Sequence, residues 1–207
     1  DVYKRQLKHY VLNTGSMLPF KNTEESIYYY LSGRGITALY LPHEAVTAME
    51  SDMAIWVPPD TKGEIRNTGE GPLRCIFASC APSKGSSAAD SKPIPEEPPI
   101  VRLNEVRPLR LVKGFGTDSR VMFSKETLTR RIGFFEVNSY SPGAKTTVHV
   151  HPNVEETYYV FRGEGRMTVG KEHPTIRAGS VAYIPPDIAH NVENIGSDIL
   201  QVLLVTY

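Results

Sequence analysis

Short apolar runs separated by turn residues recur along most of the chain. They are about four to eight residues long and rich in Val, Ile, Tyr and Phe, and Gly, Pro, Asn and Asp stand between them. Helical periodicity is absent, apart from a short turn expected near residues 123–127. The pattern predicts an all-β protein of antiparallel strands, arranged as a sandwich or a barrel. The clearest expected strands are Arg131–Tyr140, Thr157–Arg162, Gly165–Val169, Val181–Pro185 and Ile199–Tyr207.

The pattern occurs twice, because three segments of the first half resemble three segments of the second half in the same order. The matching pairs are YYYLSGRG (28–35) with YYVFRGEG (158–165), AIWVPPD (54–60) with AYIPPD (182–187), and IRNTGEGPLRCIF (65–77) with VENIGSDILQVLL (192–204). Such a repeat predicts two copies of one β module.

The composition between the copies predicts the domain organisation. Residues 81–100 are rich in Ser, Pro and charge, which is typical of a linker. We therefore expect an N-terminal module over 1–80, a linker over 81–100 and a C-terminal module over 101–207. The first copy has little sequence ahead of its first match, so either this module is naturally smaller or its upstream strands have been lost, which is the interpretation we favour. The opening DVYKRQ shows neither strand alternation nor a helix cap and is left out of the fold prediction.

The composition limits which binding partners and which cellular location can be expected for this protein. The 207 residues carry a formal net charge of zero and no basic block, which speaks against nucleic acid as a partner. No run of 18 apolar residues is present, so no membrane span is expected, and we predict a cytoplasmic protein. Cys75 and Cys80 stand five residues apart in one expected strand. They would point to opposite faces, so we interpret them as small buried hydrophobes, with a zinc or redox role as the alternative.

The segment HVHPNVEETYYVFRGEG (149–165) is unusually rich in metal-ligand side chains. His149 and His151 would share one face of a strand, and Glu156 would open the next strand after a Pro-Asn break. His190 follows a Pro-Pro-Asp turn at the start of another expected strand. Three neutral imidazoles and a carboxylate suit one divalent transition ion, such as Mn, Fe, Co, Ni, Cu or Zn. The two histidines taken alone could equally be surface or hydrogen-bonded residues.

Two sequence motifs resemble those of the cupin family. The first, G(X)5HXH(X)4E(X)6G, is matched at every spacing by Gly143, His149, His151, Glu156 and Gly163. The second, G(X)5PXG(X)2H(X)3N, is matched by Gly179, Pro185, His190 and Asn194, with Asp187 at its middle glycine, a turn position that Asp tolerates. The resemblance is strong over 130–207 and looser over 22–80. It implies a bicupin, with two tandem jelly-roll (double-stranded β-helix) barrels.

The resemblance also implies which residues bind metal. His149, His151, Glu156 and His190 would be the ligands, and Glu155 ranks below Glu156 because it faces the other side of its strand. Aligning the repeat places Pro19, Lys21, Ser26 and Gly63 at the corresponding positions of the first copy. The N-terminal cupin would therefore be degenerate, without metal ligands, and would serve a structural role, with a metal-free ligand pocket as the alternative.

These residues predict a metal-dependent enzyme that acts on a small organic substrate. We expect a dioxygenase-type oxidoreductase whose metal site has three histidines and one glutamate, since four ligands leave two positions for substrate, or for substrate and dioxygen. The alternatives are a non-redox isomerase, lyase or decarboxylase, and a cupin that binds a small ligand without catalysis. Tyr158 and Tyr183 are candidates to line the pocket, although tyrosines in a barrel wall are commonly structural. Because strand edges of small barrels are often covered, we expect a homodimer.

Overall fold

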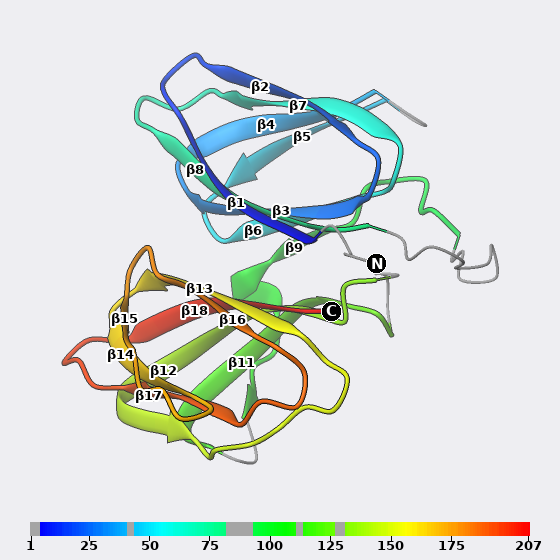
Figure 1. The fold of residues 1–207 in the computed structure, drawn as a ribbon. Coiled ribbons are helices and arrows are strands. Elements are labelled where there is room, and N and C mark those ends of the chain that lie inside the picture. Colours follow the sequence, from blue (N-terminus) through cyan, green and yellow to red (C-terminus); the bar gives the residue numbers. More distant parts are fainter. Residues whose placement is uncertain (1–4, 41–43, 82–92, 111–113, 127–130) are drawn as a thin grey trace. The chain divides into compact units, whose positions relative to one another are not determined.

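The computed structural model describes residues 5–40, 44–81, 93–110, 114–126 and 131–207. The chain divides into two compact units, Asp1–Glu105 with Thr127–Arg131 and Val106–Glu126 with Ile132–Tyr207 (Figure 1). Both units consist of antiparallel strands, so the all-β prediction is confirmed. Within the described residues no helix has the length and apolar character needed to cross a membrane.

The described part of the first unit holds nine strands in two sheets. In order they are β1 (Arg5–Leu12), β2 (Met17–Asn22), β3 (Glu25–Ser32), β4 (Arg34–Leu39), β5 (Ala45–Glu50), β6 (Met53–Val57), β7 (Thr61–Asn67), β8 (Leu73–Cys80) and β9 (Ile100–Arg102). One sheet has the order β1-β8-β3-β6-β9 and the other the order β2-β7-β4-β5. Side chains of both sheets meet in one apolar core that includes Tyr28, Ile55, Ile65 and Leu73.

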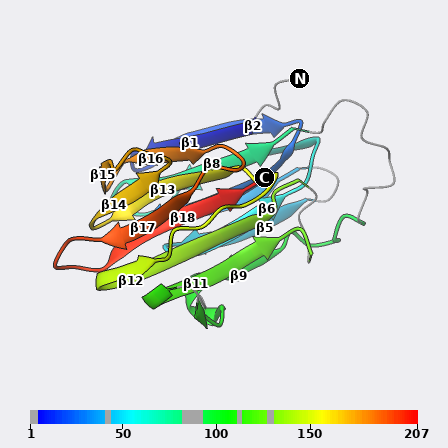
Figure 2. The same ribbon diagram turned by 60° about the horizontal axis from the view of Figure 1, so that its bottom comes forward.

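The second unit holds a nine-stranded sheet. Its strands are β10 (Leu109–Arg110), β11 (Gly114–Ser124), β12 (Phe134–Thr146), β13 (Glu156–Arg162), β14 (Glu164–Val169), β15 (Thr175–Arg177), β16 (Val181–Ile184), β17 (His190–Asn194) and β18 (Leu200–Thr206). The main path is β15-β14-β17-β12-β18-β13-β16, and β11 pairs with β12 and β10. Figure 2 shows the long strand β12 between β11 and β18. Because β12 also reaches β17 through Lys145, the sheet curls into a nearly closed barrel, as expected for a cupin jelly roll.

The inner face of this barrel follows from the two-residue alternation of its strands. Tyr140, Tyr158, Val202 and Leu204 are buried and belong to one apolar core. Along β12, Asn138 stands two residues from Tyr140 and therefore shares this inner face. The inner face thus carries both the apolar core and polar side chains of β12, since Asn138 pairs with the core residue Val202.

The two units repeat the same local backbone features. The β3–β8 register shifts between Tyr30 and Ser32, and the β13–β18 register shifts between Val160 and Arg162. A glycine with positive φ, Gly33 or Gly163, follows each of these irregularities. The repeat predicted from the sequence therefore extends to the position of a β-bulge in each copy.

The proline turns of the two copies also match. Asp60 and Asp187 both follow a Pro-Pro pair and both have positive φ, 58° and 64°. Asp187 therefore occupies the left-handed turn position that the cupin motif gives to glycine, as predicted.

Several details differ from the sequence prediction. Strand β11 continues through Ser124, and residues 125–126 form a turn, so the short turn expected near residues 123–127 begins later than predicted; residue 127 lies outside the described residues. The only helix in the described chain is a 3₁₀ turn, η2 (Leu103–Glu105). Arg5 and Gln6 begin β1, because they pair with the end of β8. Tertiary pairing supplies what the local pattern of these segments lacks.

The boundary between the modules also lies elsewhere than the composition indicates. Residues 100–102 pair with β6, and residues 101–105 lie in the first unit. Of the expected linker, residues 82–92 lie outside the described residues. Cys75 and Cys80 both lie on β8, buried and free, and burial raises the pKa of the Cys75 thiol to about 12. Such a thiol stays protonated, which agrees with the structural interpretation.

Candidate metal centre

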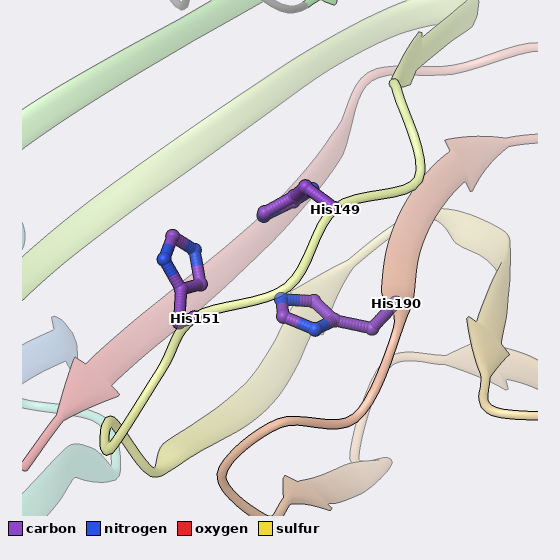
Figure 3. Close-up of side chains that lie close together, drawn as sticks. All are labelled: His149, His151 and His190. Atoms are coloured by element: carbon purple, nitrogen blue, oxygen red, sulfur yellow. The ribbon is translucent and has the colours of Figure 1, made fainter.

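His149, His151 and His190 converge at the end of the second barrel. His149 and His151 follow the end of β12 in an extended segment, and the backbone of His149 forms an isolated antiparallel bridge with His190 at the start of β17. The sequence placed both histidines within a strand, which is wrong for most of this segment. Their two-residue spacing still turns both rings to one side, and Figure 3 shows the three imidazoles around one point.

The ligand atoms of these three imidazoles lie within 4.8 Å of one another. The ring centres of His149 and His190 are 4.4 Å apart, and those of His149 and His151 are 4.8 Å apart. The carboxylate of Glu156, at the start of β13, lies beside two of the rings. Its Oε2 is 2.7 Å from His190 Nε2, and its Oε1 is 3.6 Å from His151 Nε2.

Backbone carbonyls orient two of the imidazoles. Nδ1 of His149 lies 2.8 Å from the carbonyl oxygen of Thr147, and Nδ1 of His190 lies 2.8 Å from that of Ile188. A carbonyl only accepts hydrogen bonds, so each Nδ1 carries the hydrogen and each neutral ring presents the Nε2 lone pair. This is the arrangement in which histidine serves as a metal ligand.

The surroundings of His190 Nε2 indicate whether the site suits a cation. This nitrogen is buried and makes no hydrogen bond of good geometry within the described residues, although Glu156 Oε2 lies close to it. In the neutral ring it is a lone pair that faces a second acceptor. The arrangement requires a positive charge nearby, from a proton or a metal ion. The donor set of three imidazoles and a carboxylate fits one divalent transition metal ion.

The same pair perturbs the local pKa values. Burial raises the pKa of Glu156, but the neighbouring His190 and His151 outweigh burial and hold this pKa below its ordinary value. Burial lowers the pKa of His190, but Glu156 and the carbonyl of Ile188 outweigh burial and raise it. Without metal, the proton therefore stays on His190 to a higher pH than usual, and a metal ion must displace it.

A cavity of about 700 Å³ adjoins these side chains. Its wall includes His149, His151 and Glu156, and its apolar part includes Phe134, Tyr140 and Leu204. A volume of this size suits a small organic molecule. The cluster of ligand atoms therefore faces a space in which such a molecule could reach it.

Tyr158, a candidate from the sequence, is among the residues that line the cavity. Its hydroxyl donates to Glu156 Oε2 at 3.1 Å, and burial, followed by the nearby Glu156 charge, raises the pKa of Tyr158 well above its ordinary value. The phenol therefore remains a hydrogen-bond donor and helps to hold the carboxylate in place.

Tyr183 does not line the cavity, so the expectation for this residue is not met. It pairs with Thr157 in the β13–β16 register, on the face opposite to Glu156 and Tyr158. It is 53% exposed, and its hydroxyl donates to Glu155 at 2.8 Å. Proximity to the proline turn suggested a place in the pocket, but strand register turned the ring outward.

Sequence reasoning missed several polar residues of the cavity wall, among them Glu136 and Asn138 on β12. Both stand at alternate positions of an apolar strand, in the segment FFEVNSY. That alternation is ordinarily the signature of a solvent-facing side. Because Phe135 and Val137 are buried on the other face, the strand is covered on both sides and the polar positions face the cavity.

The described part of the first unit lacks the corresponding ligands. In the β2–β7 register Gly63 pairs with Phe20, just as His190 bridges His149, so the counterpart of His149 is Phe20 and not Pro19. The predicted alignment was therefore wrong by one residue, because a gap cannot be placed from sequence in a segment without matching letters.

A ring and neutral polar groups occupy the space in the first unit. The Phe20 ring centre lies 5.1 Å from that of Tyr28. Asn22 Nδ2 donates to Ser26 Oγ at 2.6 Å and lies 3.4 Å from the hydroxyl of Tyr28. Among the residues that the structure describes, this unit contains no group of three metal-ligating side chains. The prediction that the imidazoles occur in one copy only agrees with this geometry.

Comparison with known proteins identifies the family. Residues 137–206 match the Cupin domain. The chain is 42% identical over 65 residues to an uncharacterised protein, MJ1618, of Methanocaldococcus jannaschii, and this alignment covers 31% of the chain and 52% of that protein. It is also 42% identical over 67 residues to oxalate decarboxylase OxdC of Bacillus subtilis, covering 30% of the chain and 17% of OxdC. The chain thus spans about half of the first relative and a small part of the second.

Protein SchB of Streptomyces halstedii is covered more fully. It is 31% identical over 97 residues, which are 47% of the chain and 68% of SchB. A solved structure of a Bacillus subtilis OxdC variant superposes with a TM-score of 0.79 at 18% identity, covering 98% of the chain and 68% of that structure, which shows the shared fold. On the domain match and the coverage of its relatives, the chain belongs to the cupin family.

Proposed function

We propose that this protein is a metal-dependent enzyme acting on a small organic substrate. In this proposal His149, His151, Glu156 and His190 hold one divalent transition metal ion. The observation that carries the proposal is the cluster of three imidazoles beside the carboxylate of Glu156, of which His149, His151 and Glu156 line a cavity of about 700 Å³. A structural metal site needs no such cavity.

The reaction we favour is that of a dioxygenase-type oxidoreductase. The bound ion would supply Lewis acidity and, as Fe(II), one-electron chemistry with dioxygen. The chain's own residues have separate tasks. The carbonyls of Thr147 and Ile188 orient two ligand rings, and Tyr158 holds the carboxylate of Glu156. Phe134, Tyr140 and Leu204 provide an apolar surface that excludes water from the body of a bound substrate.

A non-redox isomerase, lyase or decarboxylase is the second candidate. The 42% identity to oxalate decarboxylase OxdC over 67 residues favours this candidate. That enzyme contains Mn(II) centres. The cavity argues against a substrate as small as oxalate, because its volume is that of a drug-sized site. A cupin that binds a small ligand without turnover is the remaining alternative.

We also propose that the chain is a bicupin, with a degenerate N-terminal barrel and a metal-binding C-terminal barrel. The matching bulges and proline turns of the two units support a common origin for both. The N-terminal cupin would then have a structural role. A homodimer and a cytoplasmic location remain predictions from the sequence.

Metal loading with oxygen measurement tests the reaction. Purified protein loaded with Fe(II) is expected to consume dioxygen in the presence of a catechol, flavonol or diketone, while the His190→Ala variant consumes none. His173→Ala is the matched control, because His173 lies outside the cluster and is exposed. Turnover of a small acid or sugar without dioxygen, with Mn(II) or Zn(II), would move the assignment to the non-redox candidate. Tight ligand binding without turnover under any metal would favour the binding protein.

A further inference from the structure

Glu136 and Asn138 form a polar patch on the inner face of the metal-bearing barrel. Asn138 Nδ2 donates to Glu136 Oε1 at 2.9 Å, and Ser119 Oγ donates to Glu136 Oε2 at 2.9 Å. Both Glu136 and Asn138 line the cavity. Burial raises the pKa of Glu136 more than the two hydrogen bonds lower it, and the Glu156 charge raises it further. The patch is thus a connected polar group in the cavity wall.

One atom of this patch has no partner. Asn138 is 2% exposed, and its Oδ1 makes no hydrogen bond within the described residues. A buried amide oxygen left unsatisfied costs about 1–3 kcal/mol, so such an atom in a cavity wall calls for a ligand. The oxygens of Glu136, which already accept one hydrogen bond each, have a further lone pair each. The patch therefore presents acceptors, and it suits a group that donates hydrogen bonds.

The strand registers place this patch two strands away from Tyr158, whose hydroxyl holds Glu156. Glu136 pairs with Leu204 of β18, and Leu204 pairs with Tyr158 of β13. Neighbouring strands lie about 4.8 Å apart, so the backbones of Glu136 and Tyr158 are roughly 10 Å apart across the sheet. Leu204 lies between them and also lines the cavity. A ligand that contacts both the metal ion and the patch would need an apolar body of about one ring, with a short substituent that reaches the patch.

The corresponding positions of the first unit do not carry such a patch. By the β1–β8 register, Lys8 pairs with Phe77 and Tyr10 with Cys75, which are the repeat counterparts of Leu204 and Val202. Lys8 and Tyr10 thus occupy the positions of Glu136 and Asn138. The copy without the imidazoles is therefore also the copy without the pair of acceptors, which links the patch to the ligand site of the second unit.

We propose that Glu136 and Asn138 form a subsite that binds a hydroxyl or amino group at the end of the substrate remote from the metal ligands. The substrate class is then an apolar, ring-sized molecule with a chelating oxygen pair at one end and a hydrogen-bond donor at the other. This inference rests on the proposed function, because the metal ion would hold the chelating end. It assigns to the second barrel a specificity determinant that its metal motifs do not contain.

Two matched catechols test the subsite by calorimetry on zinc-loaded protein, where no turnover with dioxygen intervenes. One probe is ethylcatechol and the other is hydroxyethylcatechol, each substituted para to one hydroxyl. The wild type should bind hydroxyethylcatechol about five- to tenfold more tightly, which is the effect of one net hydrogen bond to a buried acceptor. In Asn138→Leu the two affinities should become equal.

A second variant and a control distinguish loss of the subsite from misfolding of the protein. The double variant Glu136→Leu/Asn138→Leu removes both members of the hydrogen-bonded pair, which leaves fewer unsatisfied groups than a single change, and it too should bind both probes equally. Ser139→Ala is the control, because Ser139 lies on the opposite face of β12 and should preserve the wild-type preference.

The outcomes separate the two proposals. Equal binding of both probes by the wild type, or an unchanged preference in both leucine variants, overturns the subsite and leaves the metal proposal standing. Failure of both catechols to bind protein that contains zinc by elemental analysis overturns chelation at the metal, and with it the subsite.

Discussion

Asn67 and Asn194, one in each unit, make the same three hydrogen bonds. Each side-chain amide donates to two backbone carbonyls, and each side-chain oxygen accepts from the N–H two residues further on. The partners are Leu12, Gly71 and Gly69 for Asn67, and Tyr140, Asp198 and Gly196 for Asn194. Both asparagines are buried at the end of a strand. Asn194 therefore holds the turn after its strand through all three of these hydrogen bonds.

Replacing either asparagine should destabilise its own unit by a similar amount. Asn67→Ala and Asn194→Ala each leave two carbonyls and one N–H without a partner, so a loss of about 2–4 kcal/mol in the free energy of unfolding is expected. Urea denaturation followed by circular dichroism measures it, with the exposed Asn13→Ala as control. A loss below about 1 kcal/mol for either variant would contradict this role.

Gly163 and Gly143 allow two reasons for requiring glycine to be distinguished: a positive φ, and a lack of space for a Cβ. Both have positive φ, 81° and 74°. A Cβ on Gly163 would lie 2.7 Å from the carbonyl oxygen of Ile199 and 2.8 Å from Cα of Leu200, whereas a Cβ on Gly143 meets nothing within 4 Å.

Gly143→Ala should therefore cost only the backbone strain, about 1–2 kcal/mol, and Gly163→Ala at least twice as much. Thermal unfolding of the two variants beside the wild type measures the difference. Equal melting temperatures for the two variants would show that β18 can move away from the turn.

Removal of one imidazole should abolish stable metal binding. His151→Ala and His190→Ala each leave two imidazoles and one carboxylate, and the apparent affinity for Zn(II) should fall by at least about 100-fold. Competition with a chromophoric chelator measures the affinity, and His173→Ala should bind as the wild type does. Full metal content in both ligand variants would place the ion elsewhere.

Glu136 should make stability depend on pH. Its pKa is raised in the folded state above the ordinary 4.5, so the folded protein holds this proton more tightly than the unfolded chain does. The stability that the neutral carboxyl retains at low pH is then lost as pH rises from about 4.5 through the folded value. Glu136→Gln cannot titrate, so its stability relative to the wild type should increase as the pH rises above about 4.5.

Urea unfolding of the metal-free proteins at several pH values measures this difference. Glu164→Gln, on the exposed surface of β14, is the control and should follow the wild type throughout. A constant difference between Glu136→Gln and the wild type across these pH values would show that Glu136 has the same pKa in both states.

Local patterns were sufficient for most of the second barrel. The strands expected at 157–162, 165–169, 181–185 and 199–207 lie within about a residue or two of β13, β14, β16 and β18. Local patterns failed where pairing overrides them. Ser124 was assigned to a helical turn, but pairing with Phe134 extends β11 through it. A propensity extends over a few residues, whereas a strand is stabilised by its neighbours.

The proposed metal-ligand set, and the absence of its histidines from the first copy, could be predicted from the sequence alone. Residue spacing is a local property, and the two-residue spacing of His149 and His151 turns both rings to one side, next to Glu156 at the start of β13. Only the tertiary structure decided which other side chains share the cavity. Glu136 faces it and Tyr183 does not, because the registers of β12 with β18 and of β13 with β16 set the direction of each side chain. Those registers depend on the packing of the whole barrel, which no short stretch of sequence contains.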